Sequence, residues 1–178
     1  MIRRRIAARR WVDPDGQERA FLSEDETANL CIAKGTLNPQ DRSVIEEHVA
    51  LTWRMLNTLP WPRNLRNVPE YAGSHHEHLD GKGYPRGLGE ADLSTQARII
   101  CLADVFEALT ARDRPYKPGK PLSEVLVILG QMVRERRIDP DLFDVFVREG
   151  VWLDYARRYL TPDQIDQVSL DRIPGYVS

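Results

Sequence analysis

The chain has 178 residues, of which 42% are hydrophobic and 29% are charged, and its formal net charge is -2. This composition is typical of one soluble domain with a core of its own, and the small net charge provides no general basic field for nucleic acid. No stretch approaches the roughly 18 consecutive apolar residues that a membrane span needs, so no membrane segment is expected.

The first ten residues contain five arginines. We interpret residues 1–20 as a basic, solvated arm, and binding of this arm to nucleic acid or another acidic surface is the alternative. The arm lacks an apolar core of signal-peptide length, so secretion is not indicated. Cys31 and Cys101 lie far apart inside apolar helical patterns, which favours buried, reduced thiols and a cytoplasmic location.

Residues 21–178 read as helices separated by proline and glycine, with almost no alternating strand pattern. Residues 23–26, Ser-Glu-Asp-Glu, are a capping box and predict a helix that runs to Lys34 and stops at Gly35. Asn38 is the expected N-cap of the next helix. The buried face of that helix is expected to hold Ile45, Val49, Thr52, Leu56 and Leu59.

A shorter helix is expected from about Pro69, with a histidine pair at its end and a glycine-rich loop over residues 81–89 after it. Ser94 is a suitable N-cap for the long helix that follows. The remaining expected helices cover residues 95–112, 122–137, 139–150 and 151–160, with a helical tail to residue 168. The fold class predicted from this pattern is all-α.

Three of the four histidines fall within the stretch SHHEHLDGKGYPRGL, residues 74–88. Neighbouring residues on a helix point about 100° apart, so His75 and His76 can serve two metal ions, or one ion and a substrate oxygen. A polar surface loop is the other interpretation. His48, alone beside an apolar helix face, reads more simply as a hydrogen-bonded core residue.

Asp104 lies in the middle of an otherwise apolar helix, where a carboxylate needs a cation or several hydrogen bonds. Histidine and carboxylate ligands from separate helices suit Fe, Mn or Zn, which lower the pKa of a bound water. Arg114 and Lys117 flank Pro115 and suit phosphate oxygens, although an exposed basic loop has the same composition. Taken alone, residues 80–85 form an ordinary turn.

Taken together, HHEHLDGKGYPRGL and the following ARIICLADVFEALTARDRPYK resemble the HD-GYP family. Its members are helical, metal-dependent phosphohydrolases that cleave the second messenger cyclic di-GMP. The family motif HHExxDGxGYP is matched at every fixed position from His75 through Pro85, and the resemblance extends over about residues 22–168. It implies a helical bundle of the HD/PDEase type.

The resemblance also implies roles for individual residues. Those matching metal ligands are His48, His75, His76 and Asp104; those matching substrate-binding positions are Arg114, Lys117, Lys82, Gly83, Tyr84 and Pro85; Asp80 is the candidate for proton transfer. His78 falls on a variable position and is interpreted as a surface histidine. The Gly-Tyr-Pro loop is also the expected contact for a GGDEF-type signalling protein.

One feature of the family has no counterpart here. The family takes its name from an adjacent His-Asp pair, but the sequence contains no His-Asp dipeptide and no histidine before His48. We therefore expect residues 21–178 to be a partial domain that lacks its N-terminal helices. Without a bridging carboxylate to offset the repulsion between two cations, one divalent ion is expected rather than two.

Two functions follow as expectations. The first is hydrolysis of cyclic di-GMP to pGpG and GMP. The second is a catalytically inactive module that binds a metal, a nucleotide or a partner through the Gly-Tyr-Pro loop, and the missing His-Asp pair favours it. Apolar surface left by missing helices would be buried in a homodimer.

Overall fold

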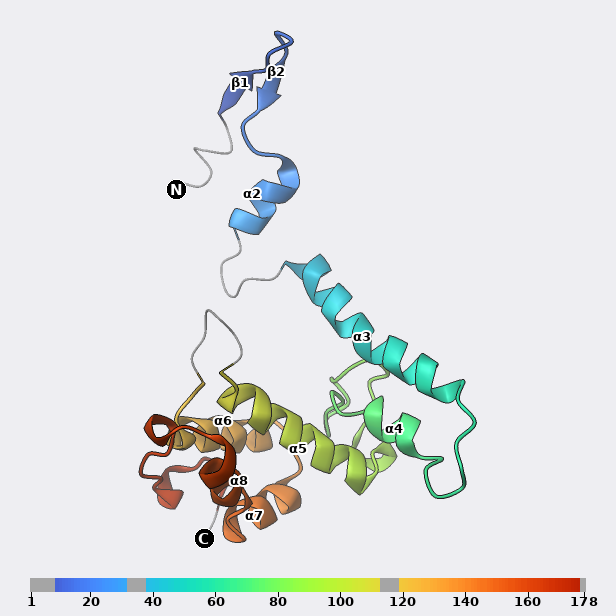
Figure 1. Ribbon diagram of the computed structural model, residues 1–178, viewed down its shortest axis with the longest axis vertical. Coiled ribbons are helices and arrows are strands. Elements are labelled where there is room, and N and C mark those ends of the chain that lie inside the picture. The colour runs from blue at the N-terminus through green and yellow to red at the C-terminus, as the bar shows by residue number, and fades with distance from the viewer. Residues whose placement is uncertain (1–8, 32–37, 113–118, 177–178) are drawn as a thin grey trace. The chain divides into compact units, whose positions relative to one another are not determined.

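The computed structural model describes residues 9–31, 38–112 and 119–176 (Figure 1). The chain divides into two compact units, Met1–His48 and Val49–Ser178. Helices make up most of the regular structure, which confirms the all-α prediction. The predicted boundary between an arm of residues 1–20 and a domain of residues 21–178 stays a prediction.

The first unit begins with a short hairpin that the sequence analysis did not anticipate. Strand β1, Arg10–Val12, pairs antiparallel with strand β2, Glu18–Ala20. Asp13 stabilises the connection, because its carboxylate accepts a hydrogen bond of 2.9 Å from the Gln17 backbone N–H and one of 2.6 Å from Arg19 Nε. One carboxylate thus satisfies donors from the turn and from the second strand.

Helix α2, Glu24–Leu30, follows with the predicted capping box in place, in which Ser23 accepts from the Glu26 N–H and Glu26 accepts from the Ser23 N–H. The helix ends four residues before the expected Lys34, and residues 32–37 lie outside the described part of the chain.

The two cysteines differ in their surroundings, and both are free thiols. Cys31 is exposed, so the expectation of a buried thiol is wrong at that position, whereas Cys101 is buried. Burial raises the pKa of Cys101 to about 11, because an apolar environment disfavours the thiolate, and the negative charge of Asp104 adds to the shift.

Helix α3, Pro39–Asn57, runs across the boundary between the two units. Its predicted cap is present, since the Asp41 N–H donates to Asn38 Oδ1 at 2.7 Å. Only the middle of the predicted apolar face is buried. Val49 is fully buried, Thr52 and Leu56 are half-buried, and Ile45 and Leu59 are exposed.

The second unit is built from helices α4, Val68–Ala72; α5, Thr95–Thr110; α6, Leu122–Arg134; α7, Pro140–Arg148; and α8, Val151–Tyr159, with short 3-10 turns η1 to η3 at Glu90–Asp92, Pro162–Gln164 and Leu170–Arg172. Helix α5 packs against α4, α6 and α7, and α8 packs against α7 (Figure 1). Among the described residues, no helix is both long enough and apolar enough to cross a membrane.

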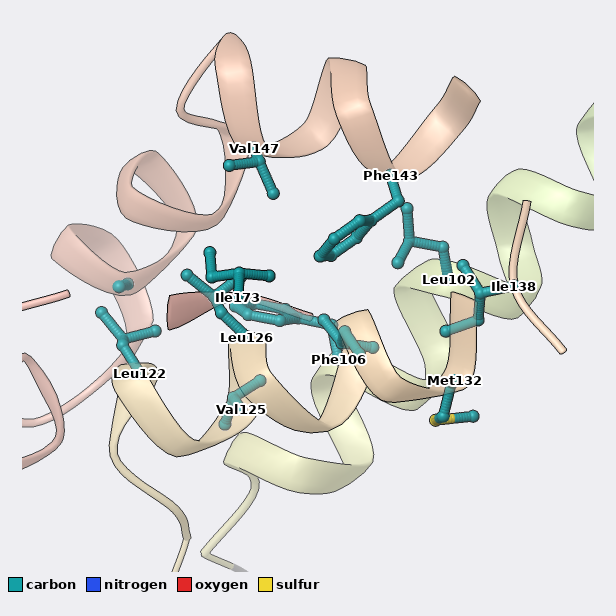
Figure 2. Packing of buried hydrophobic residues seen from close by; sticks show 12 residues of the cluster. Leu102, Phe106, Leu122, Val125, Leu126, Met132, Ile138, Phe143, Val147 and Ile173 are labelled. Carbon is teal, nitrogen blue, oxygen red and sulfur yellow. The ribbon is translucent and has the colours of Figure 1, made fainter. Parts of the chain in front are cut away.

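The main core of this unit lies among α5, α6, α7 and α8, where side chains from all four helices meet those of the C-terminal segment. Figure 2 shows Phe143 of α7 pointing toward α6, with Leu126 and Ile173 close by. The fully or almost fully buried members include Leu122, Val125, Leu126, Leu129, Ile138 and Phe143. The apolar spacing of α6 and α7 that predicted helices is therefore the spacing that fills this core.

A buried amide joins the end of α5 to the start of α6. Gln164, in the C-terminal turn η2, donates to the backbone oxygens of Thr110 at 2.8 Å and Lys120 at 3.3 Å. Gly119 packs so closely beneath it that an added Cβ would lie 2.2 Å from the Thr110 oxygen. The two ends of the segment between α5 and α6 are thus held by one side chain.

Replacement of Phe143 by alanine is expected to lower the free energy of unfolding by about 3–5 kcal/mol, because the change leaves a cavity in a core that cannot close around it. Urea denaturation followed by circular dichroism measures this loss.

The matched control on the same helix is Val145→Ala, since Val145 is 43% exposed. A loss within about 0.5 kcal/mol is expected there. Equal losses for the two variants would contradict the placement of the core.

Candidate metal centre

The histidine pair follows the end of α4 instead of lying on it, which corrects the expected placement. Helix α4 ends at Ala72, and His75 and His76 lie in the turn after Gly73. A Cβ at Gly73 would lie 2.5 Å from Trp53 Cδ1, so α3 and the end of α4 approach each other as closely as a glycine allows.

His75 is oriented by the backbone of the helix it follows. Its Nδ1 lies 2.7 Å from the carbonyl oxygen of Ala72. Because a carbonyl oxygen only accepts, the contact with Ala72 places a proton on Nδ1 and leaves Nε2 as the nitrogen available to a metal. The His76 ring lies beside it, with centroids 4.2 Å apart, and the two side chains offer ligand nitrogens within 4.8 Å of each other.

His48 is the last residue of the first unit and has the same local geometry. Its Nδ1 hydrogen-bonds the carbonyl oxygen of Ile45, one turn earlier on α3. The residue is exposed, so the simpler interpretation of His48 as a core histidine does not hold. Its Nε2 is again the nitrogen that carries the lone pair.

Asp104 lies on α5, half-buried, and lines an open, mostly apolar pocket together with His75. Thr52, Tyr71 and Ile100 form other parts of the wall. Within the described ranges, Asp104 has no hydrogen-bond or ion-pair partner. A half-buried carboxylate and an imidazole that line the same pocket are donor types that fit a hard or borderline divalent cation.

Asp80 and Lys82 form a turn at the start of the signature loop. The Asp80 carboxylate accepts from the Lys82 N–H at 3.0 Å and pairs with Lys82 Nζ at 3.1 Å. The backbone hydrogen bond from Lys82 lowers the pKa of Asp80, so this carboxyl is ionised at neutral pH and accepts protons weakly. Holding the turn is therefore the role that its contacts favour.

Tyr84 connects this loop to the histidines. Its ring stacks on the His76 ring, with centroids 4.8 Å apart and planes 26° apart, and its N–H donates to the His76 oxygen at 3.2 Å. The Tyr84-Pro85 peptide bond is cis. Arg114 and Lys117, predicted to contact phosphate, lie outside the described residues.

The sequence analysis assigned no role to Glu77, although it occupies the third fixed position of the HHE motif. Its side chain is almost completely buried and accepts backbone N–H groups of Arg86 and Leu88. His78 is also less exposed than expected, and burial, helped by the charge of Arg137, lowers its pKa. The signal that could have identified Glu77 is its charge at a fixed position of the motif.

Comparison with known proteins places these residues in a wider context. The HD domain family matches residues 24–142. A 3'3'-cGAMP-specific phosphodiesterase 1 of Vibrio cholerae is 52% identical over 83 residues, 47% of this chain and 19% of that protein. A cyclic di-GMP phosphodiesterase of Thermotoga maritima is 32% identical over 119 residues, 67% of this chain and 32% of that protein. The chain thus spans a third or less of the length of these relatives.

Gly83→Ala is expected to lower the free energy of unfolding by about 1–3 kcal/mol, because a Cβ there would lie 2.4 Å from the Cα of Glu77 and the loop would have to move. Urea denaturation measures the loss, and tyrosine and tryptophan fluorescence reports a displaced loop.

Gly89→Ala is the matched control in the same loop. The nearest atom to a Cβ at Gly89 is the Leu79 oxygen at 3.9 Å, so a change within about 0.5 kcal/mol is expected. If both variants are as stable as the original chain, the close packing of Gly83 on Glu77 is wrong.

Proposed function

Because the chain belongs to the HD domain family, and within it to the HD-GYP type, we propose that it is a metal-dependent phosphohydrolase module that acts on a cyclic dinucleotide. The observation that carries the proposal is the pocket that both His75 and the carboxylate-bearing Asp104 line, with His75 Nε2 left free of its backbone contact. Proteins of this family are metal-dependent hydrolases, and such a donor pair matches that chemistry.

The proposed ligands of the ion are His75, His76 and Asp104, with His48 as a further imidazole. When bound, a divalent ion of the Fe, Mn or Zn class supplies Lewis-acid polarisation and lowers the pKa of water. The protein's own contribution is to fix the orientation of two imidazoles through the Nδ1 contacts of His48 and His75, which leaves Nε2 of each as the nitrogen for the ion. One ion per chain is proposed, because the sequence contains no His-Asp pair.

The proposed substrate contacts come from two segments of the sequence. Arg114 and Lys117 are proposed to neutralise phosphate oxygens, as is Lys82, whose side chain is 82% exposed. Gly83, Tyr84 and Pro85 are proposed to form the surface against which the nucleotide rests. Asp80 remains a proposed proton acceptor, although its observed contacts favour its role in the turn.

The substrate is proposed to be cyclic di-GMP, which the name of the Thermotoga relative specifies. A second substrate, 3'3'-cGAMP, is favoured by the 52% identity to the Vibrio cholerae phosphodiesterase. The two molecules share the cyclic phosphodiester backbone and differ in one base. The groups proposed here to contact phosphate would therefore serve both.

A module that binds but does not hydrolyse is the alternative function. The absence of a His-Asp dipeptide from the sequence favours it, since two cations require a bridging ligand. The signature loop would then bind a nucleotide or a signalling protein of the GGDEF type. A cytoplasmic location remains proposed as well, because both cysteines are free thiols.

The metal site is tested by equilibrium dialysis of the purified chain against Mn²⁺ or Zn²⁺. One ion per chain is expected, and His75→Ala is expected to weaken its affinity by at least about tenfold because a direct ligand is lost. His78→Ala is the matched control, since His78 contacts Arg137 instead of the pair, and unchanged affinity is expected.

The same samples are incubated with cyclic di-GMP and with 3'3'-cGAMP, and products are separated by chromatography. Hydrolysis that His75→Ala abolishes supports the enzymatic function, and metal binding without hydrolysis supports the binding module. Two bound ions with turnover would overturn the single-ion proposal, and no bound ion would overturn the metal site.

The proposed homodimer rests on an apolar stripe that runs along the end of α3 and continues to Leu59, just after the helix. Leu51, Met55 and Leu59 follow one another at intervals of four residues, and each is about half exposed. Leu51→Glu together with Met55→Glu is expected to convert a dimer to a monomer in light scattering. A chain that is monomeric before substitution at micromolar concentration contradicts the dimer.

A further inference from the structure

Glu77 lies between the second and third histidines of the signature and is only 2% exposed. Its Oε1 accepts the backbone N–H of Arg86 at 2.7 Å, and its Oε2 accepts that of Leu88 at 2.9 Å. A carboxylate this deeply buried is stable only when its oxygens are hydrogen-bonded, and bonds to a charged acceptor are the stronger kind. Both oxygens of Glu77 are used to hold the far side of the Gly-Tyr-Pro loop.

The near side of the same loop rests on the backbone of residues 76 and 77. Gly83 leaves no room for a side chain above Glu77, and the Tyr84 N–H donates to the His76 oxygen. Residues 83–88 therefore curve around Glu77, with backbone contacts on both sides. At Tyr84 the loop thus packs on the backbone of residues 76 and 77, and a few residues later the Glu77 carboxylate holds it.

The side chain of Arg86 also connects the loop to the residues around the histidine pair. Its guanidinium donates to Ser74 Oγ at 2.6 Å and lies 5.5 Å from the centre of the Trp53 ring. Ser74 is 1% exposed and donates in turn to the Glu70 oxygen at 2.6 Å. The loop is thus tied to the residue directly before His75 and to α3.

We propose that Glu77 is a positioning residue for the histidine pair, acting through the Gly-Tyr-Pro loop and the Tyr84 ring. His75 is oriented by the Ala72 oxygen, and the His76 ring lies against both the His75 ring and the Tyr84 ring, stacked on the second. When Glu77 holds the loop, Tyr84 lies flat against His76 and limits the directions in which that imidazole points. The inference rests on the proposed metal site and adds the residue that shapes it.

A purely structural role would give Glu77 an effect on stability alone. A positioning role predicts a change in metal affinity that is separate from stability, because partners behind a ligand typically alter affinity by about 10–100-fold. The probe is Co²⁺, whose visible absorption depends on the number and arrangement of its ligands. It reports the site without any turnover.

Glu77→Gln is the informative variant. It preserves size and one acceptor oxygen, but its NH₂ group then faces a backbone N–H, so one of the two bonds to the loop is lost. A Co²⁺ dissociation constant raised by about tenfold is expected, together with an altered absorption band. If circular dichroism shows that this variant is unfolded, Arg86→Met takes its place, since it removes the guanidinium contacts with Ser74 and Trp53 and leaves the Glu77 carboxylate and its backbone hydrogen bonds in place.

Asp139→Asn is the matched control. Asp139 is another buried carboxylate that accepts two backbone N–H groups, those of Asp141 at 2.9 Å and Leu142 at 3.1 Å, at the start of α7. Burial alone would raise the pKa of Asp139, but hydrogen bonds from Arg98 and the helix N–H groups outweigh it and lower the pKa. A loss of stability with unchanged Co²⁺ affinity is expected.

The decisive measurement repeats Glu77→Gln in a Tyr84→Ala background. If Glu77 acts through the Tyr84 ring, the second substitution adds little once the ring is absent. Fully additive losses, or an unchanged affinity in Glu77→Gln alone, overturn the inference while leaving the metal site intact. Absence of His75-dependent Co²⁺ binding in the original chain overturns the metal site first, and the inference with it.

Discussion

The hydroxyl of Ser94 joins the two helices on which the candidate site depends. It accepts the Ala97 N–H and so caps α5, and it donates to the Glu70 carboxylate of α4, with oxygen distances of 2.9 and 3.0 Å. Helix α4 ends at Ala72, shortly before the histidine pair, and α5 carries Asp104. One side chain therefore sets the spacing between elements that bring nitrogen and oxygen donors to the same pocket.

Local signals predicted most of the helices because they depend on residues a few positions apart. Ser23, Asn38 and Ser94 all cap the helices expected of them, and Asp139 caps α7 in the same way, since a side-chain acceptor before an apolar periodic run satisfies N–H groups that the helix cannot. Gly150 adopts the left-handed conformation between α7 and α8, which is also a local effect because glycine favours this conformation at a helix end.

The departures arise from contacts between distant residues. The place where α4 ends reflects the approach of Trp53 to Gly73, which no pattern within residues 68–76 contains. The half-buried face of α3 depends on which elements reach it, so periodicity predicted the face but not how much of it is covered. The hairpin of residues 10–20 is stabilised by the contact between Asp13 and Arg19 across the turn. Such a contact does not produce the alternation of apolar and polar residues by which strands are predicted.

The candidate site divides in the same way. The histidine pair and Asp104 were identifiable from residue type and placement. A carboxylate or an imidazole in apolar surroundings is costly unless a partner compensates it, so such residues point to a site. The contacts of Glu77 with Arg86 and Leu88 could not be predicted, because they depend on the path by which the loop comes back to Glu77. A side chain that binds backbone groups needs no complementary side chain, so the sequence contains no second residue from which the contact could be predicted.

Gln164 has a consequence for how the chain can vary. Its amide holds the carbonyl oxygens of Thr110 and Lys120, so α5 and α6 are joined independently of the residues between them. Insertions or deletions between these two anchors would then change the length of the connection without shifting either helix, since each doubling of the length of a connection costs only about 0.6 kcal/mol.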